Sequence, residues 1–337
     1  MSRFIGIDLH KQRFTACYRD EAGEQKLRPF ELAELTAFTQ TLQADDEVAV
    51  EATANSGFFY QAVAPHVRRV HLVNPNQFAV VAASTKKTDR HDASLLALFL
   101  SKGMLPEVRP VDTQRADVKS LLATRARLVE SRTALKNKIH SVLTAHGIVP
   151  RKLRLASQRG LDCVLKLEVN AAARFELELL VDQIRHLTKG LDRIEQQLKH
   201  SDCQLPGHPN VASITGIGDV GASTLLSVIG NVHDFHGPKQ LTAYFGIAPT
   251  VHCSNNEIHC GPITKHGSRQ GRHALVQCTL VAIHRHPDLH RFYERIKARR
   301  GSGKAIIATA RKLLGLVYFT LVNDIVWADC ANGVVAE

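Results

Sequence analysis

Two aspartates, Asp89 and Asp92, stand three residues apart before an apolar run in KKTDRHDASLLALFL, residues 86–100. The apolar run predicts a helix, and positions i and i+3 of a helix share one face. Both carboxylates can therefore reach one cation, and Mg²⁺ prefers such oxygen ligands. The simpler interpretation is that Asp89 caps this helix, because acidic residues suit the positive end of the helix dipole. The choice depends on whether other carboxylates reach the same place.

Two further carboxylates, Asp8 and Glu51, end the strand-like segments RFIGIDL and VAVE. Residues 1–112 predict three early strands followed by alternating helix and strand, the order of an RNase H-like (RuvC-like) α/β domain. Its first strand and its later parallel strand are neighbours, so Asp8 and Glu51 should lie side by side. The helix with the paired aspartates should cross the same edge. Four carboxylates cannot stay ionised together without cations, and two Mg²⁺ ions suit phosphodiester chemistry.

The composition favours a polyanionic partner. The chain has 337 residues, a formal net charge of +11 and 18 histidines, with a pI near 9.4. Nucleic acid is the expected ligand of such a basic globular chain. We expect no membrane span and no signal peptide from the apolar runs and the N-terminus MSRFIGIDLHK. Seven scattered cysteines suit free thiols in a reducing cytoplasm, and the basic charge suits a location beside nucleic acid there.

Residues 113–202 predict an α-helical coiled-coil region. One apolar repeat recurs every seven residues, and a second alternates steps of three and four, at Leu177, Leu180, Ile184, Leu187, Leu191, Ile194 and Leu198. Such a seam suits either an intramolecular helical hairpin or a dimerising coiled coil, and the two remain open. Arg125 and Arg132 lie between the apolar positions of the segment with the seven-residue repeat, which predicts a first helix, and there they could bind phosphate.

Residues 203–337 predict a mostly helical domain. Its first motif is the string GIGDVG at 216–221. The string matches a dinucleotide-binding pattern, with Asp234 at a compatible distance, but the strands predicted for such a site lie elsewhere in the chain. We favour a helix-hairpin-helix-like turn, in which Gly216 and Gly218 allow backbone N–H groups to meet a DNA phosphate.

The string HCSNNEIHC, residues 252–260, predicts a short β-hairpin that turns at Asn255-Asn256. Its two His-Cys pairs invite a zinc site, but their spacing fits no common one. Ser254 near the tip could attack a phosphodiester, with Lys265, Arg269 and Arg272 nearby in the sequence. An ordinary turn serine would look the same at this stage.

Six segments in this order resemble the IS110/IS1111 family of transposases: FIGIDLHK, VAVEATANSG, KTDRHDA, ITGIG, YFGIAP and GPITKHGSRQGRHAL. The resemblance implies a RuvC-like DEDD domain, a helical middle and a C-terminal domain that supplies a catalytic serine. The acidic tetrad becomes Asp8, Glu51, Asp89 and Asp92. The serine becomes Ser254, with Ser268 as the alternative because Asn255 stands where the family usually has Gly.

The resemblance also implies partners and a reaction. The expected partners are donor and target DNA, a structured guide RNA encoded by the element, and further copies of the chain in a dimer or tetramer. The expected reaction is Mg²⁺-dependent DNA recombination through a serine nucleophile. Two alternatives remain: a RuvC-like nuclease that hydrolyses branched DNA, and a Piv-type invertase, which shares these motifs.

Overall fold

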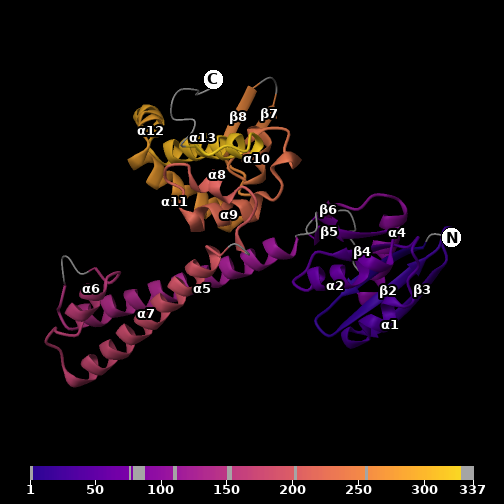
Figure 1. Cartoon of the computed structure of the whole chain (residues 1–337), viewed down its shortest axis with the longest axis horizontal. Helices are drawn as coiled ribbons and strands as arrows, with labels where there is room; N and C mark the ends of the chain where they lie inside the picture. Colours follow the sequence, from indigo (N-terminus) through magenta and orange to yellow (C-terminus); the bar gives the residue numbers. More distant parts are fainter. Residues whose placement is uncertain are drawn as a thin grey trace. The chain divides into compact units, whose positions relative to one another are not determined.

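The computed structural model describes residues 3–75, 77–78, 88–108, 112–149, 154–200, 203–254 and 257–327, with the side chains of 252–260 excepted. It divides into two compact units, Met1–Asp112 and Thr113–Glu337 (Figure 1).

The first unit is built on a six-stranded mixed sheet in the order β3-β2-β1-β4-β5-β6. The strands are β1 (Phe4–Leu9), β2 (Arg13–Arg19), β3 (Gln25–Glu31), β4 (Glu47–Glu51), β5 (Arg69–Val73) and β6 (Glu107–Val108). β1, β4 and β5 are parallel, whereas β2, β3 and β6 run antiparallel to their neighbours. The mixed α/β fold predicted for this region is confirmed.

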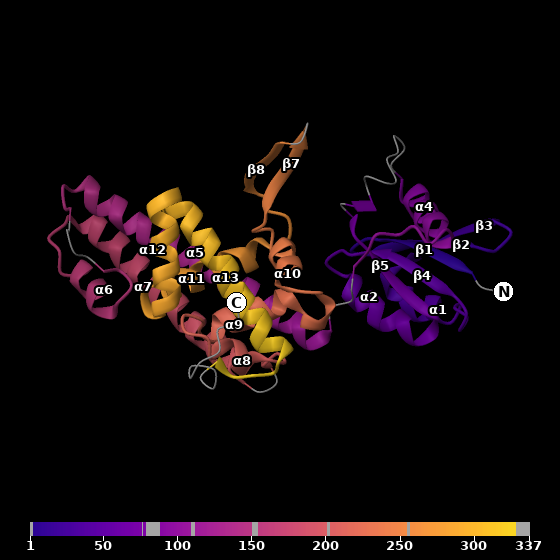
Figure 2. The same ribbon diagram turned by 90° about the horizontal axis from the view of Figure 1, so that it is seen from above.

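Helices cover both faces of this sheet (Figure 2). On one face, η1 (Leu32–Glu34), α1 (Leu35–Thr39), α2 (Ser56–Val63) and η2 (Ala64–His66) enclose a cluster with Phe14, Phe30, Phe38 and Phe59. α4 (Asp89–Ser101) lies on the other face. Successive residues of a strand point to opposite faces. Ile5 and Ile7 therefore join the aromatic cluster, while Gly6 faces α4.

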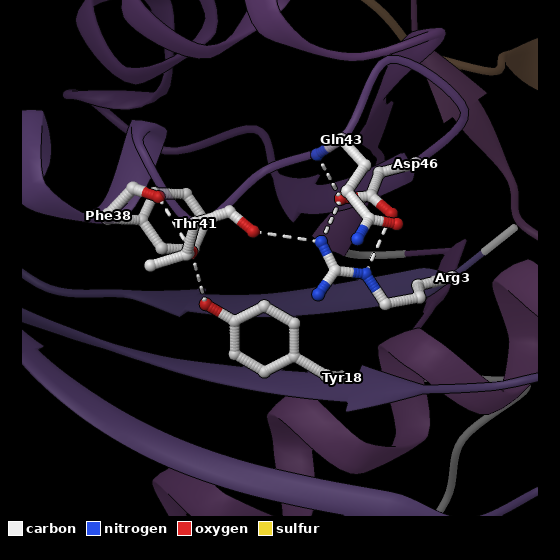
Figure 3. A network of polar contacts seen from close by, with 6 residues as sticks. All are labelled: Arg3, Tyr18, Phe38, Thr41, Gln43 and Asp46. Atoms are coloured by element: carbon white, nitrogen blue, oxygen red, sulfur yellow. Dashed lines mark hydrogen bonds and ion pairs between the residues drawn. The ribbon is translucent and has the colours of Figure 1, made fainter. Parts of the chain in front are cut away.

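A polar network ties the start of β1 to the loop before β4 (Figure 3). The Arg3 guanidinium donates to both carboxylate oxygens of fully buried Asp46, at 2.9 and 2.6 Å. Arg3 also donates to the Thr41 carbonyl at 2.9 Å, and the Tyr18 and Thr41 hydroxyls lie 3.0 Å apart. Loss of Arg3 would leave the fully buried Asp46 carboxylate unpaired, which is costly. The network therefore stabilises the pairing of β1 with β4, whose far ends carry Asp8 and Glu51.

The second unit begins with a long helical hairpin. α5 (Thr113–Ala145) and α7 (Ala171–Leu198) pack against each other, with the short α6 (Gln158–Val164) between them in sequence (Figure 1). The pairs Arg125–Glu195 and Lys138–Glu176 show that the two helices are antiparallel. Leu177, Ile184, Leu191 and Leu198 of the seam are buried. The apolar seam is thus covered within one chain, and a dimerising coiled coil is not required to bury it.

The remaining helices form a bundle with the base of this hairpin. They are α8 (His208–Ala212), α9 (Asp219–Ile229), η4 (Val232–Asp234), α10 (Pro238–Tyr244), α11 (Arg269–Arg285), α12 (Pro287–Arg300) and α13 (Ser302–Val322). One hydrophobic core includes Val118 of α5, Leu198 of α7 and Leu314 of α13. The helical hairpin and the helices that follow it therefore pack together. The final region is mostly helical, as predicted.

α13 corrects the expectation that no segment is long and apolar enough to cross a membrane. Among the described residues it alone passes that test of length and composition. It contacts α8, α10, α11 and α12. Its buried residues, among them Ala310, Leu313 and Val317, line the core of the second unit. The apolar composition of α13 thus has an explanation within the fold.

Candidate active site

Asp8 and Glu51 lie at matching ends of two parallel strands. The register pairs Ile7 of β1 with Val50 of β4, and the next positions along the two strands are Asp8 and Glu51. Asp8 stands two residues after Gly6, so both belong to the face of β1 that α4 covers. The sheet thus brings both positions to the edge where the sequence places them.

Small residues let α4 approach this edge closely. A Cβ atom at Gly6 would lie 2.1 Å from the Ala93 carbonyl oxygen and 2.4 Å from the Ala97 nitrogen. Ala93 and Ala97 are fully buried. Any side chain at Gly6 would push the helix away. The glycine in FIGIDL therefore positions α4, whose first turn contains Asp89 and Asp92.

The N-cap of α4 is Thr88, not Asp89. The Thr88 Oγ1 accepts a hydrogen bond from the His91 backbone N–H at 3.2 Å, and Thr88 has an extended backbone. This geometry is that of an N-cap. The interpretation of Asp89 as the cap is wrong, because the hydroxyl before it already satisfies the helix end.

Three side chains converge beside the end of β1. The His10 Nε2 lies 3.2 Å from Asp8 Oδ2 and 3.4 Å from Asp89 Oδ1. These donor atoms of Asp8, His10 and Asp89 lie within 4.8 Å of one another, close enough to hold one metal ion. Arg13 of β2 reaches Asp89 Oδ2 at 3.3 Å. The sequence reasoning missed His10 and Arg13, although His10 follows Asp8 by two residues in the IDLHK motif.

Electrostatics at Asp8 favour a bound cation. Burial is the largest cause that raises the pKa of the Asp8 carboxyl; His10 opposes this, and the charges of Asp89 and Asp92 raise the pKa further. Asp92 is thus close enough to act on Asp8. Glu51 is not part of the donor cluster found among the described residues, and its place follows from the strand register. Burial and neighbouring negative charges destabilise the ionised form of a carboxylate, and a bound divalent metal would stabilise it.

The predicted β-hairpin is present in the second unit. β7 (Pro249–Ser254) and β8 (Glu257–Ile263) are antiparallel, and Ser254 pairs with Glu257 at the last register position before the turn. Asn255 and Asn256 lie outside the described residues, as do the side chains of 252–260. The role of the Ser254 hydroxyl and the rejection of zinc at His252, Cys253, His259 and Cys260 remain predictions.

Two glycine loops hold the base of this hairpin. Gly246 and Gly267 both have positive φ, and a Cβ there would lie 1.9 Å from the His266 oxygen and 2.1 Å from the Tyr244 oxygen, respectively. Lys265 donates its backbone N–H to the Gly246 carbonyl at 3.0 Å. The YFG and KHGS motifs therefore run directly against each other. Their glycines serve this close backbone approach.

The loop after the hairpin gives different roles to the predicted residues. Ser268 is the N-cap of α11, and its hydroxyl accepts from the Gly271 N–H at 3.1 Å. Arg272 donates to the carbonyls of His266 and Gly267 at 3.2 and 3.1 Å. Lys265 and Arg269 are exposed. Ser268 and Arg272 thus have local structural roles, whereas Lys265 and Arg269 are open to a ligand.

Four other predicted phosphate contacts also have structural roles. Arg125 donates to Glu195 Oε1 at 2.9 and 2.6 Å, and Arg132 donates to Thr188 Oγ1 at 3.3 Å, which joins α5 to α7. Gly216 has a φ of +102°, and a Cβ there would lie 2.6 Å from Ala282 of α11. Gly218 is the N-cap of α9, and α8 rather than a strand precedes it. Phosphate binding by these residues stays a prediction, and the helix-hairpin-helix motif is not confirmed.

Comparisons with known proteins identify the family. A DEDD transposase model of the IS110 type matches residues 5–148, and a model described as "Transposase IS116/IS110/IS902 family" matches residues 208–294. Together they match more than half of the 337 residues. The chain belongs to the IS110 family of transposases. The first match includes the four carboxylates, and the second includes Ser254, Lys265 and Arg269.

Known transposases resemble this IS110-family chain along most of their length. The transposase for insertion sequence element IS1111A from Coxiella burnetii is 27% identical, over 96% of this chain and 90% of that protein. A probable family 20 transposase from Pseudomonas aeruginosa is 25% identical, over 95% and 97%. The transposase for IS1328 from Yersinia enterocolitica is 26% identical, over 83% and 84%. The chain is a DNA transposase of an insertion sequence, and its DEDD domain indicates use of a divalent metal.

Proposed function

We propose that this transposase cuts and rejoins DNA under the direction of a structured RNA encoded by its own element, with Mg²⁺ and Ser254 as the nucleophile. The observation that carries the proposal is the convergence of Asp8, His10 and Asp89 at the edge of the sheet, where the donor atoms lie within 4.8 Å of one another. Thr88 caps α4, so capping does not explain Asp89.

Two Mg²⁺ ions would be held by the four carboxylates of Asp8, Glu51, Asp89 and Asp92. When bound, Mg²⁺ neutralises the charge that develops on a reacting phosphate. His10 and Arg13 position the carboxylates: His10 contacts both Asp8 and Asp89, and Arg13 contacts Asp89 from β2. A cation would also relieve the repulsion that Asp89 and Asp92 impose on Asp8.

Ser254 would supply the nucleophile. Its Oγ forms a bond to phosphorus, the phosphorus bond to the leaving DNA oxygen breaks, and the serine proton passes to a base or to water. The resulting phosphoserine ester conserves the bond for rejoining. Exposed Lys265 and Arg269 would bind the phosphate: Lys265 lies in the loop after the hairpin, which the Gly246 and Gly267 contacts hold in place, and Arg269 begins α11 directly after this loop.

A nucleic-acid guide and several copies of the chain complete the proposal. The net charge of +11 suits a chain that binds an RNA as well as donor and target DNA. Two DNA sites must be cut and exchanged, so we expect a homodimer or homotetramer to act on them.

Reconstituted strand cleavage tests this function. Purified chain, target DNA, Mg²⁺ and an RNA transcribed from the flank of the gene should give cleavage at sites that the RNA can pair with. Changing the pairing segment of the RNA should move the cleavage site. Equal cleavage without RNA would contradict guidance and favour an unguided invertase or nuclease. Persistent cleavage in excess chelator would contradict the metal.

A further inference from the structure

A basic surface lies on the hairpin of α12 and α13, outside every site described above. α12 has the sequence PDLHRFYERIKARR, with five Lys and Arg residues and two acidic residues, and buries only Leu289. It packs along α13, and a single glycine, Gly301, separates the two helices (Figures 1 and 2). This surface, the α12–α13 basic surface, consists of Phe292, Arg295, Arg299, Arg300, Lys304 and Lys312.

The cations of α12 fall into two groups. Arg291 pairs with Asp288, and Lys297 pairs with Glu294 at 3.0 Å, each within one turn of the helix. Arg295, Arg299 and Arg300 are exposed, as is Lys304 just beyond them in α13, and these four form no ion pair with any residue that the structure describes. The helix thus neutralises one set of charges and leaves the other available.

Helix stability accounts for only part of the second group. Arg299 and Arg300 lie in the last turn of α12, where the helix dipole favours cations. Lys304 lies in the first turn of α13, where the dipole disfavours a cation and no acidic residue is present. Lys304 therefore stands at an electrostatic cost beside Arg299 and Arg300, and an external anion bound at this inter-helix connection would offset that cost.

An aromatic ring links this cluster to the next turn of α13. The Arg295 guanidinium lies 5.4 Å from the centre of the Phe292 ring, and Lys312 Nζ lies 5.0 Å from it. At 1.5 Å per residue, Lys304 and Lys312 stand about 12 Å apart along α13. The exposed cations therefore form a strip as long as several phosphate spacings of one nucleic-acid strand. The Phe292 ring holds Arg295 and Lys312 together on this surface by cation–π contacts, and both cations stay exposed where a phosphate can reach them.

We propose that the α12–α13 basic surface binds a phosphodiester backbone, as a contact separate from the catalytic residues. This proposal rests on the proposed function, because it takes nucleic acid as the ligand. The chemistry is shared by duplex DNA and by a helical part of the guide RNA. Contacts from Arg and Lys to phosphate oxygens position a nucleic acid and carry no sequence information directly.

Two double variants with equal loss of charge test the proposal. Arg299→Gln with Lys304→Gln removes two unpaired cations, one from α12 and one from α13, whereas Arg291→Gln with Lys297→Gln removes two paired cations from α12. Fluorescence anisotropy would measure binding of a random-sequence 30-base-pair DNA duplex and of a structured RNA across a salt series, without Mg²⁺. Circular dichroism melting would verify that both variants fold.

The unpaired double variant should bind at least one probe about 10-fold more weakly, and its slope of log K against log salt should fall by about 2, near one for each lost phosphate contact. The paired control should change by less than about 2-fold. Loss confined to RNA assigns the surface to the guide, and loss confined to duplex DNA assigns it to the substrate.

Equal shifts in both variants, or none in either, would overturn the proposal. So would a loss seen only with phosphatidylglycerol–phosphatidylcholine vesicles, which would make the surface a membrane contact. These outcomes are independent of the proposed catalysis, because binding is measured without Mg²⁺ and with Asp8 and Ser254 intact.

Discussion

Asp89 and Asp92 occupy the first turn of a helix that Thr88 already caps. Their charges gain only about 0.5 kcal/mol each from the helix dipole. The Arg13–Asp89 pair is largely exposed and adds little stability. Folding alone therefore gives little reason to place two carboxylates where they raise the pKa of Asp8. At the scale of the residue, the metal-binding role explains what the capping role does not.

Asp89→Asn and Asp92→Asn should each lower Mg²⁺-dependent strand cleavage by about 100-fold or more, because charge rather than shape holds the metal. The free energy of unfolding should fall by no more than about 1 kcal/mol, since the Thr88 cap stays. Cleavage assays and urea denaturation would measure the two effects.

Thr88→Ala is the matched control for these variants. It should lower stability by about 1 kcal/mol through loss of the cap, yet retain cleavage because both charges remain. The metal interpretation is wrong if both Asn variants cleave normally with Mg²⁺ while Thr88→Ala does not.

At the scale of the element, the position of α4 depends on Gly6. A Cβ there would meet backbone atoms of Ala93 and Ala97, and not flexible side-chain ends. Gly6→Ala should lower the free energy of unfolding by about 2–3 kcal/mol and also reduce cleavage, because Asp89 and Asp92 move with the helix. Urea denaturation and the cleavage assay would measure both.

Gly57→Ala provides the control. Gly57 lies inside α2, and a Cβ there would meet nothing within 4 Å. It should be neutral or stabilising by up to about 1 kcal/mol, because alanine is the better helix former. If both glycine variants behaved alike, close approach of α4 would not be what positions the carboxylates.

The elements that the sequence predicted well are those with a local signal. Alternation of apolar residues and the order of strands and helices predicted the mixed sheet, and the residue pair at 255–256 predicted the β-hairpin. The seam of α7 predicted a helix but not its partner, because an apolar stripe fits an intramolecular or an intermolecular neighbour equally well. Only the structure shows that Leu177, Ile184 and Leu191 are buried within the chain.

Contacts between distant residues were harder to predict at the candidate site. The strand ends with Asp8 and Glu51 could be placed from the order of the elements. The contacts of Asp89 with His10 and Arg13 join residues more than 70 positions apart, and no local pattern encodes them. Arg125 looked like a phosphate ligand because its partner, Glu195, is 70 residues away. From the sequence, α13 did not look apolar over a length sufficient to cross a membrane, because Lys304, Arg311 and Lys312 interrupt its apolar residues.

At the scale of the whole molecule, the proposed chemistry is divided between two units. The carboxylates belong to Met1–Asp112, and Ser254 belongs to Thr113–Glu337. We predict that each working site combines the carboxylates of one protomer with the serine of another. A mixture of Asp8→Asn and Ser254→Ala proteins, each inactive alone, should then regain partial cleavage, because some assemblies contain one intact site.

Size-exclusion chromatography of differently tagged proteins would show whether mixed oligomers form. If they form and every mixing ratio stays inactive while wild type cleaves, both residue sets must come from the same protomer.

The central claim is that Ser254 attacks DNA at a site that depends on the Asp8 cluster. Its most direct test is denaturing gel electrophoresis of the chain after incubation with labelled DNA, RNA and Mg²⁺. Wild type and Ser268→Ala should give a covalent protein–DNA band, because Ser268 serves as the cap of α11. Ser254→Ala and Asp8→Asn should give none. A band that persists in Ser254→Ala and disappears in Ser268→Ala would contradict the claim, and cleavage by wild type without any band would replace the serine nucleophile with water.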